Sequence, residues 1–269
     1  MKTRAITGFF FIVVMIGSVL FGQYIFGVFF LLLSLLCLRE FYGLIKQTGL
    51  SPNTQTGLLN GFVIYAVFAL VLIDHSQAMH KLLFLLPVTL SAVFIQELFK
   101  KTEAPFTNIA YTFTGILYIC LPFTFFHALA YAKGGFNFHY PLAFLLLLWA
   151  NDTGAYLVGI KFGRTKLFER HSPKKTWEGF IGGVLISAGV ALIIGHYYTE
   201  LKWGQWVIVA VLISFFGTTG DLIESMFKRS INVKDTGSIL PGHGGLLDRF
   251  DGLLLATPLV YTYLYLISN

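Results

Sequence analysis

The chain has 269 residues, of which 56% are hydrophobic and only 12% are charged. Because a soluble domain carries about 25% charged residues, this composition excludes a soluble globular protein and indicates a polytopic membrane protein. The formal net charge of +6 does not predict a nucleic-acid partner, because no RNA- or DNA-binding motif accompanies it.

Nine apolar runs predict an all-α fold of about nine transmembrane helices, because most of them approach the ~20 residues that cross the hydrocarbon core. In chain order they cover 5–22, 24–38, 57–73, 82–99, 109–130, 141–160, 177–198, 204–223 and 250–267. Only Gly17, Gly22 and Gln23 separate the first two, so one long re-entrant segment is the alternative there. No small-residue cleavage site follows the basic N-terminus, so we expect a retained first helix rather than a signal peptide.

The placement of lysine and arginine predicts the orientation of the chain. With a cytosolic N-terminus and nine spans, only Lys81, Lys133 and Lys202 fall on the outer side, which leaves 16 of the 19 basic residues in the cytosol. The positive-inside rule favours this arrangement. We therefore expect a multi-pass protein of the inner (cytoplasmic) membrane, with loops 161–176 and 224–249 in the cytosol and the C-terminus outside.

The two halves of the sequence differ in polar chemistry. Residues 1–140 are apolar helices with short loops and no distinctive motif, whereas residues 141–269 carry almost all the unusual polar residues. Cys37 and Cys120 both fall in predicted spans and are expected to be buried apolar fillers. We therefore expect the catalytic region to be C-terminal.

Asp152 lies in the middle of the sixth predicted span, beside Asn151 and the small residues Thr153, Gly154 and Ala155. An ionised aspartate at that depth costs at least ~2.5–3.5 kcal/mol on insertion scales. It must therefore face a polar cavity, a cation or a polar partner, and metal binding is the role we favour. The alternative is a structural polar contact between helices.

The segment from Ser172 to Gly179 resembles a phosphate-binding entrance to a helix. Ser172 and Thr176 can cap the helix expected to begin near Trp177, whose free N–H groups would attract an anion. Lys174 and Lys175 add full positive charges. No Walker P-loop is present, and an ordinary basic loop touching anionic lipid is the alternative.

Acidic residues gather at the ends of the last two predicted spans. Asp221 shares a helix face with Glu224 and Ser225, and Asp248 and Asp251 stand three residues apart where the ninth span begins. The loop between these spans folds back, so the carboxylates can converge at the cytosolic boundary. Oxygen ligands favour Mg²⁺ over zinc. We therefore expect a magnesium site, although a solvated loop with this composition by chance is the plainer alternative.

Bases and glycines fill the connection between these acidic residues. Gly244 and Gly245 would let backbone N–H groups approach a phosphate closely, and lysine and arginine would offset its charge. The segment reads Ser225-x-Phe227-Lys228-Arg229-x₄-Lys234-Asp235-x-Gly237-x₂-Leu240-Pro241-x-His243-Gly244-Gly245-Leu246-x-Asp248-Arg249-Phe250-Asp251. This pattern resembles the signature of the phosphatidate cytidylyltransferases (CDP-diacylglycerol synthases), and the blocks 151–164 and 172–183 resemble the same family in the same order.

The resemblance implies an integral membrane enzyme, thought to be dimeric, that joins CTP and membrane phosphatidate into CDP-diacylglycerol and pyrophosphate with Mg²⁺. It makes Asp221 and Asp248 the leading metal ligands, with Asp152 and Asp251 as further candidates. The number of metal ions stays open, as does a monovalent cation. The resemblance also assigns five residues to the phosphate site: Lys228, Arg229, Lys234, His243 and Arg249.

Two other functions remain open from the sequence. A cation-coupled transporter would explain Asp152 in mid-membrane, but it would not explain the basic, glycine-rich loop, and the sequence holds no inverted repeat. A CTP-dependent lipid kinase would phosphorylate a polyprenyl or similar alcohol and would yield a lipid phosphate instead of a nucleotide-bearing lipid.

Overall fold

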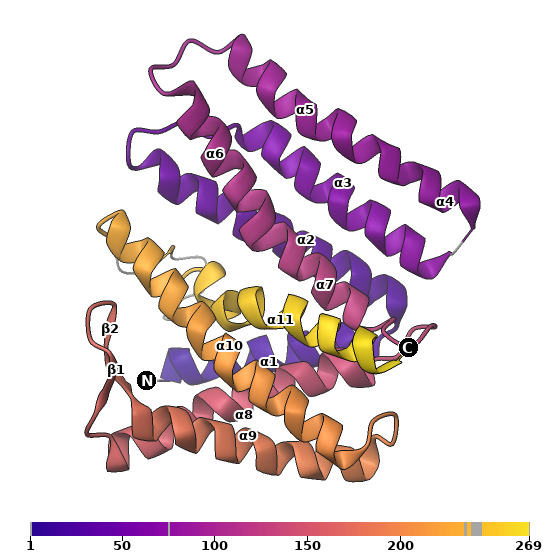
Figure 1. Ribbon diagram of the computed structural model, residues 1–269. Helices are drawn as coiled ribbons and strands as arrows, with labels where there is room; N and C mark the ends of the chain where they lie inside the picture. Colours follow the sequence, from indigo (N-terminus) through magenta and orange to yellow (C-terminus); the bar gives the residue numbers. More distant parts are fainter. Residues whose placement is uncertain (1, 75, 234–235, 238–243, 269) are drawn as a thin grey trace. The chain divides into compact units, whose positions relative to one another are not determined.

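The computed structural model describes residues 2–74, 76–233, 236–237 and 244–268 and is 79% helical (Figure 1). This confirms the all-α polytopic fold. The helices, in order, are α1 (Lys2–Leu20), α2 (Gln23–Lys46), α3 (Thr54–Ile73), α4 (Gln77–Lys81), α5 (Leu85–Leu98), α6 (Pro105–Gly115), α7 (Leu121–Leu129), α8 (His139–Phe162), α9 (Trp177–Tyr197), α10 (Trp203–Ser230) and α11 (Leu247–Ser268). A 3₁₀ turn, Leu82–Phe84, joins α4 to α5, and a π-helical turn, Ile116–Cys120, joins α6 to α7.

Eight helical segments among the described residues are long and apolar enough to cross a membrane. They correspond to eight of the nine predicted runs, with α4–α5 and α6–α7 each forming one span. The first run corresponds to α1, of which Ile6–Leu20 is the apolar stretch among the residues whose side chains are described. Gly22 has a φ of 96°, a conformation that favours glycine, and it separates α1 from α2. The first two runs are therefore two helices and not one continuous segment.

The chain divides into two compact units. The first unit comprises Met1–Phe136 and Asp235–Arg249, and the second comprises Asn137–Lys234 and Phe250–Asn269. In the first unit, α3 packs against both α2 and α5 (Figure 1). Its interior holds a cluster of rings from Phe26, Phe30 and Phe126, and the Tyr42 hydroxyl donates to the Thr112 carbonyl oxygen at 2.7 Å. The expected burial of Cys37 and Cys120 is confirmed.

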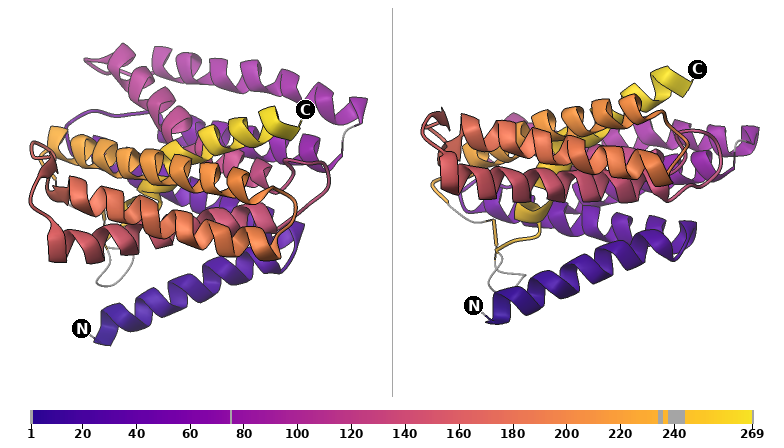
Figure 2. Two further views of the ribbon diagram at one scale, coloured as in Figure 1. Left: turned by 60° about the horizontal axis from the view of Figure 1, so that its bottom comes forward. Right: turned by 90° about the horizontal axis from the view of Figure 1, so that it is seen from below.

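In the second unit, α8, α9 and α10 lie side by side (Figure 2). Glycines allow α8 and α9 to approach closely, because a Cβ atom at Gly179 or Gly183 would lie 2.8 Å from a backbone oxygen of α8. Side chains cannot enter such a contact without moving the helices apart. Asp152 therefore belongs to a helix that is held tightly along one side.

The crossing of α10 and α11 is closer still. A Cβ atom at Gly220 would lie closer to the carbonyl oxygen of Asp251 than van der Waals contact allows, whereas one at Gly252 would be in ordinary van der Waals contact with the carbonyl oxygen of Gly217. Only glycine tolerates a backbone approach of this kind. The crossing therefore places Asp221, which follows Gly220, next to the start of the membrane-embedded part of α11.

The structure contains a β-hairpin between α8 and α9 that the sequence did not predict. Strands β1 (Lys166–Phe168) and β2 (Ser172–Thr176) pair antiparallel. The Glu178 carboxylate accepts the N–H groups of Arg164 and Thr165 at 3.0 and 3.1 Å, and so ties the start of the hairpin to α9. The Thr176 hydroxyl caps α9 by accepting the Gly179 N–H at 3.2 Å, as predicted. Ser172 lies in β2 instead of capping the helix.

Replacing Gly220 with alanine should separate α10 from α11, because the new methyl group meets a backbone carbonyl that has no freedom to rotate away. We expect destabilisation by ~1–3 kcal/mol, the usual cost of overpacking, measured as the thermal unfolding midpoint in detergent. The control is Gly189→Ala in α9, where a Cβ atom meets nothing within 4 Å and the higher helix propensity of alanine should be neutral or stabilising. Equal midpoints for the two variants would show that the crossing is looser than described.

Candidate active site

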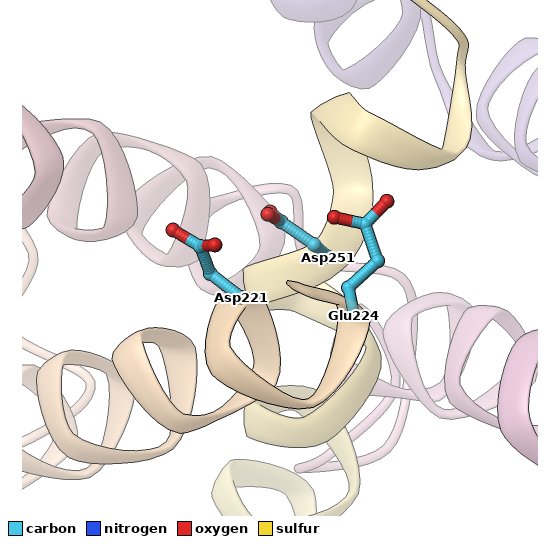
Figure 3. A group of neighbouring side chains, drawn as sticks. All are labelled: Asp221, Glu224 and Asp251. Carbon is cyan, nitrogen blue, oxygen red and sulfur yellow. The ribbon is translucent and has the colours of Figure 1, made fainter. Parts of the chain in front are cut away.

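Three carboxylates converge in the second unit, where α10 crosses α11. Asp221 and Glu224 lie one turn apart on α10, and Asp251 comes from α11 (Figure 3). Each offers one oxygen atom, and these oxygens lie within 4.8 Å of one another. We call these three residues the acidic cluster. The i, i+3 spacing explains the first two, and the glycine-mediated crossing explains why Asp251 joins them.

Two lysines offset part of this negative charge. The Lys175 ammonium group, on β2, lies 2.5 Å from Asp221 Oδ2, and the Lys228 ammonium group, one turn along α10, lies 2.9 Å from Glu224 Oε2. The side chain of Glu224 is only 1% exposed. A carboxylate so buried needs its partner, because an unpaired buried charge is strongly destabilising.

Asp152 adds a fourth carboxylate to the neighbourhood of the cluster. It interacts electrostatically with Lys175 and Asp221, and its Oδ1 atom accepts a hydrogen bond from the Asn151 amide at 3.4 Å. Four carboxylates against two ammonium groups leave a formal excess of two negative charges. Like charges this close repel unless a cation or a proton intervenes.

These residues fit a divalent metal ion. The donors are all carboxylate oxygens, which Mg²⁺ prefers, and the local charge excess equals the charge of one such ion. Of the predicted ligands, the cluster contains Asp221 and Asp251, and Asp152 lies within electrostatic reach. Glu224 was not among them. The signal was present in the sequence, because Glu224 stands at i+3 from Asp221.

Asp248, the other leading candidate for metal binding, belongs to the first unit. It lies in the first turn of α11, and its Oδ2 atom accepts the N–H groups of Thr236 and Gly245 at 3.1 and 3.0 Å. One oxygen of this carboxylate therefore holds the backbone of the loop that precedes the helix. Its pairing with Asp221 in metal binding stays a prediction.

The predicted phosphate-binding residues have different surroundings. Lys175 and Lys228 contact the acidic cluster, whereas Lys174, Arg229 and Arg249 are exposed. Gly244 has a φ of 80°, and the Gly245 N–H already donates to Asp248. Lys234 and His243 lie outside the described residues. Phosphate binding by these groups therefore stays a prediction.

Known proteins resemble this chain along almost its entire length. The model of the cytidylyltransferase family matches residues 2–267. Proteins named phosphatidate cytidylyltransferase from Staphylococcus aureus (strain COL) and Staphylococcus haemolyticus (strain JCSC1435) are 33% and 32% identical to it over 264 and 267 residues. Each alignment covers 97% of both chains.

The acidic cluster should bind a divalent cation without any substrate. We expect Asp251→Asn and Glu224→Gln to raise the Kd for Mn²⁺, a spectroscopic substitute for Mg²⁺, by at least ~10-fold, which is ~1.4 kcal/mol of binding free energy. Electron paramagnetic resonance of the purified protein in detergent measures free and bound Mn²⁺. Asp74→Asn, an exposed position between α3 and α4, is the matched control. Wild-type affinity in both cluster variants would exclude this site.

Proposed function

Because the chain belongs to the cytidylyltransferase family, and is therefore a nucleotidyltransferase, we propose that it makes CDP-diacylglycerol from CTP and phosphatidate. The relatives named phosphatidate cytidylyltransferase support this choice of substrates. The observation that carries the proposal is the acidic cluster on α10 and α11 together with its two lysines, Lys175 from β2 and Lys228 from α10. Such a combination suits a reaction between two polyanions, one of which is a lipid.

In the proposed reaction, a phosphate oxygen of phosphatidate attacks the α-phosphorus of CTP. The new P–O bond forms as the bond from the α-phosphorus to the oxygen bridging to the β-phosphate breaks, and pyrophosphate leaves with that electron pair. A phosphate monoester already carries about −1.5 to −2 charge near neutral pH, so it needs little help from a general base. The difficulty is the repulsion between the two substrates.

The residues of the second unit address that repulsion. A Mg²⁺ ion held by Asp221, Glu224 and Asp251 would offset charge on the phosphates of CTP. Lys175 and Lys228 lie at the same cluster, where an ammonium group can exchange a carboxylate partner for a phosphate oxygen. Asp152 would add negative charge that strengthens cation binding. A second metal ion and a monovalent cation remain open within this proposal.

We propose further that the enzyme is a homodimer of the inner membrane whose site faces the cytosol. CTP is a cytosolic solute, while phosphatidate lies in the leaflet, so the reaction has to occur where both are within reach. The excess of basic residues in the predicted cytosolic segments supports this orientation.

The reaction is tested with purified protein, phosphatidate, Mg²⁺ and CTP that carries its label on either the α- or the γ-phosphate. The proposal expects the α-label in a lipid and the γ-label in pyrophosphate. A lipid kinase would place the γ-label in the lipid, and a transporter would transfer neither label. Asp221→Asn is the negative control, with an expected loss of at least ~100-fold, or ~2.7 kcal/mol of transition-state stabilisation.

Asp152→Asn separates a cation-supporting role from a packing role. If Asp152 strengthens cation binding, this variant should need more Mg²⁺ for half-maximal CDP-lipid formation and should turn over more slowly. If it serves only helix packing, the amide can still hydrogen-bond and is less costly to bury. The measurement is the rate against Mg²⁺ concentration beside wild type, and superimposable curves would return Asp152 to a structural role.

The orientation is tested at the two ends of α9. Single cysteines at Lys174 and Lys202, both exposed, lie before and after this span. In intact cells, an impermeant maleimide should label position 202 and spare position 174 until the cells are opened. The native Cys37 and Cys120 are buried, so they should give little background. Labelling of position 174 from outside would reverse the predicted orientation.

A further inference from the structure

Glu40 lies in α2, within the half of the sequence that carries no recognised motif. Its Oε2 atom accepts the N–H groups of Leu246 and Leu247 at 2.8 and 3.2 Å. These are N–H groups at the start of α11, where the helix leaves them without helical partners and carries a partial positive charge. A carboxylate within a membrane-spanning helix is costly, and this pairing offsets part of that cost.

The glycines of the signature loop make room for this carboxylate. A Cβ atom at Gly237 would lie 2.5 Å from Glu40 Oε1, and one at Gly245 would overlap both Glu40 Oε1 and Thr236 Oγ1. A Cβ atom at either position would force the Glu40 carboxylate to shift. In the first unit, Gly237 and Gly245 thus serve the close approach of a protein carboxylate.

Two carboxylates together hold the described parts of this loop. Asp248 accepts the N–H groups of Thr236 and Gly245, and Glu40 accepts those of Leu246 and Leu247. Three consecutive N–H groups, 245–247, are therefore held by carboxylates that belong to two different helices. Asp248 and Arg249 follow directly, so the geometry of both depends on where Glu40 holds the start of α11.

We propose that Glu40 is a positioning residue for nucleotidyl transfer, which acts by holding the start of α11 and thereby orienting Asp248 and Arg249. It is not a metal ligand in this proposal. Oε2 is occupied by two N–H donors, and Oε1 is enclosed, with no hydrogen-bond partner among the described residues. The role requires an acceptor of the right length and shape, but it does not require a full negative charge.

Glutamine and leucine at position 40 separate these requirements. The amide oxygen of Glu40→Gln can accept the same two N–H groups, and its NH₂ group would face the Thr236 hydroxyl oxygen, which is buried and has no partner among the described residues. Glu40→Leu has a similar volume but no acceptor. We expect kcat for Glu40→Gln within ~10-fold of wild type, and a ~100-fold fall for Glu40→Leu, with KM for CTP nearly unchanged.

Cysteine labelling tests whether Glu40 keeps the loop in place, and this measurement does not depend on enzyme activity. Thr236 is 4% exposed, so a Thr236→Cys reporter should react slowly with maleimide in detergent. Adding Glu40→Leu should speed this reaction by at least ~10-fold, whereas Glu40→Gln should leave it slow. The buried Cys37 and Cys120 are internal controls for unfolding, and Glu103→Leu, at an exposed loop position, is the matched substitution.

The measurements distinguish a positioning role of Glu40 from a general structural role and from a direct role of its charge. Selective exposure of position 236 and a lower kcat in Glu40→Leu, with Glu40→Gln near wild type, support the positioning role. Reaction of all three cysteines would show that Glu40 supports the whole unit, and an inactive Glu40→Gln with a protected reporter would show that its charge acts directly. Either result overturns the proposal, as does a fully active Glu40→Leu.

The kinetic measurement rests on the proposed function, but the labelling does not. A wild type that makes no CDP-lipid product would therefore refute the proposed function alone.

Discussion

The close approach of α10 to α11 is the constraint on which the second unit depends. At Gly220 there is no room even for a methyl group against the carbonyl oxygen of Asp251. This contact brings carboxylate oxygens from two helices within 4.8 Å of one another. Repulsion would separate them, and Lys175 and Lys228 only partly offset it. The backbone contact thus holds the carboxylates together despite their repulsion, and a divalent cation would reduce that repulsion.

The protein stabilises its carboxylates in two ways. Asp221 and Glu224 face ammonium groups that can exchange partners, which suits a site that must admit polyanions. Glu40 and Glu178 instead accept backbone N–H groups at the start of a helix or hairpin, and these pairs have no reason to open during turnover. In the proposed function, the first kind of contact would serve chemistry, and the second would fix the segments that carry it. Asp248 combines a fixed contact through Oδ2 with its predicted role in metal binding.

This division changes how the glycine-rich signature is understood. Glycines in a loop with basic neighbours suggest a phosphate cradle, and that interpretation guided the sequence-based assignment of Gly244 and Gly245. In the first unit, the Gly245 N–H and its two successors instead meet carboxylates of the protein itself. The exposed backbone of glycine, which could admit a phosphate, here admits the carboxylates of Asp248 and Glu40. Because the N–H groups of residues 245–247 are already occupied, arginine and lysine side chains are better candidates than these three groups to hold a phosphate.

The sequence alone determined the features that depend on local composition. Run length predicted about nine spans and the helical class, because the thickness of the hydrocarbon core sets the length of an apolar helix; among the described residues, eight segments are long and apolar enough to cross a membrane. Local spacing likewise placed Asp221 beside Glu224 and made Thr176 the cap of α9. The short connection between the last two spans also predicted that Asp251 would meet Asp221, which the structure confirms. Tertiary structure decided two contacts between distant segments: Lys175 with Asp221, and Glu40 with Leu246. No periodicity in the sequence encodes these contacts, because each depends on how helices far apart in the chain pack together, and a buried carboxylate finds its partner only after that packing has formed.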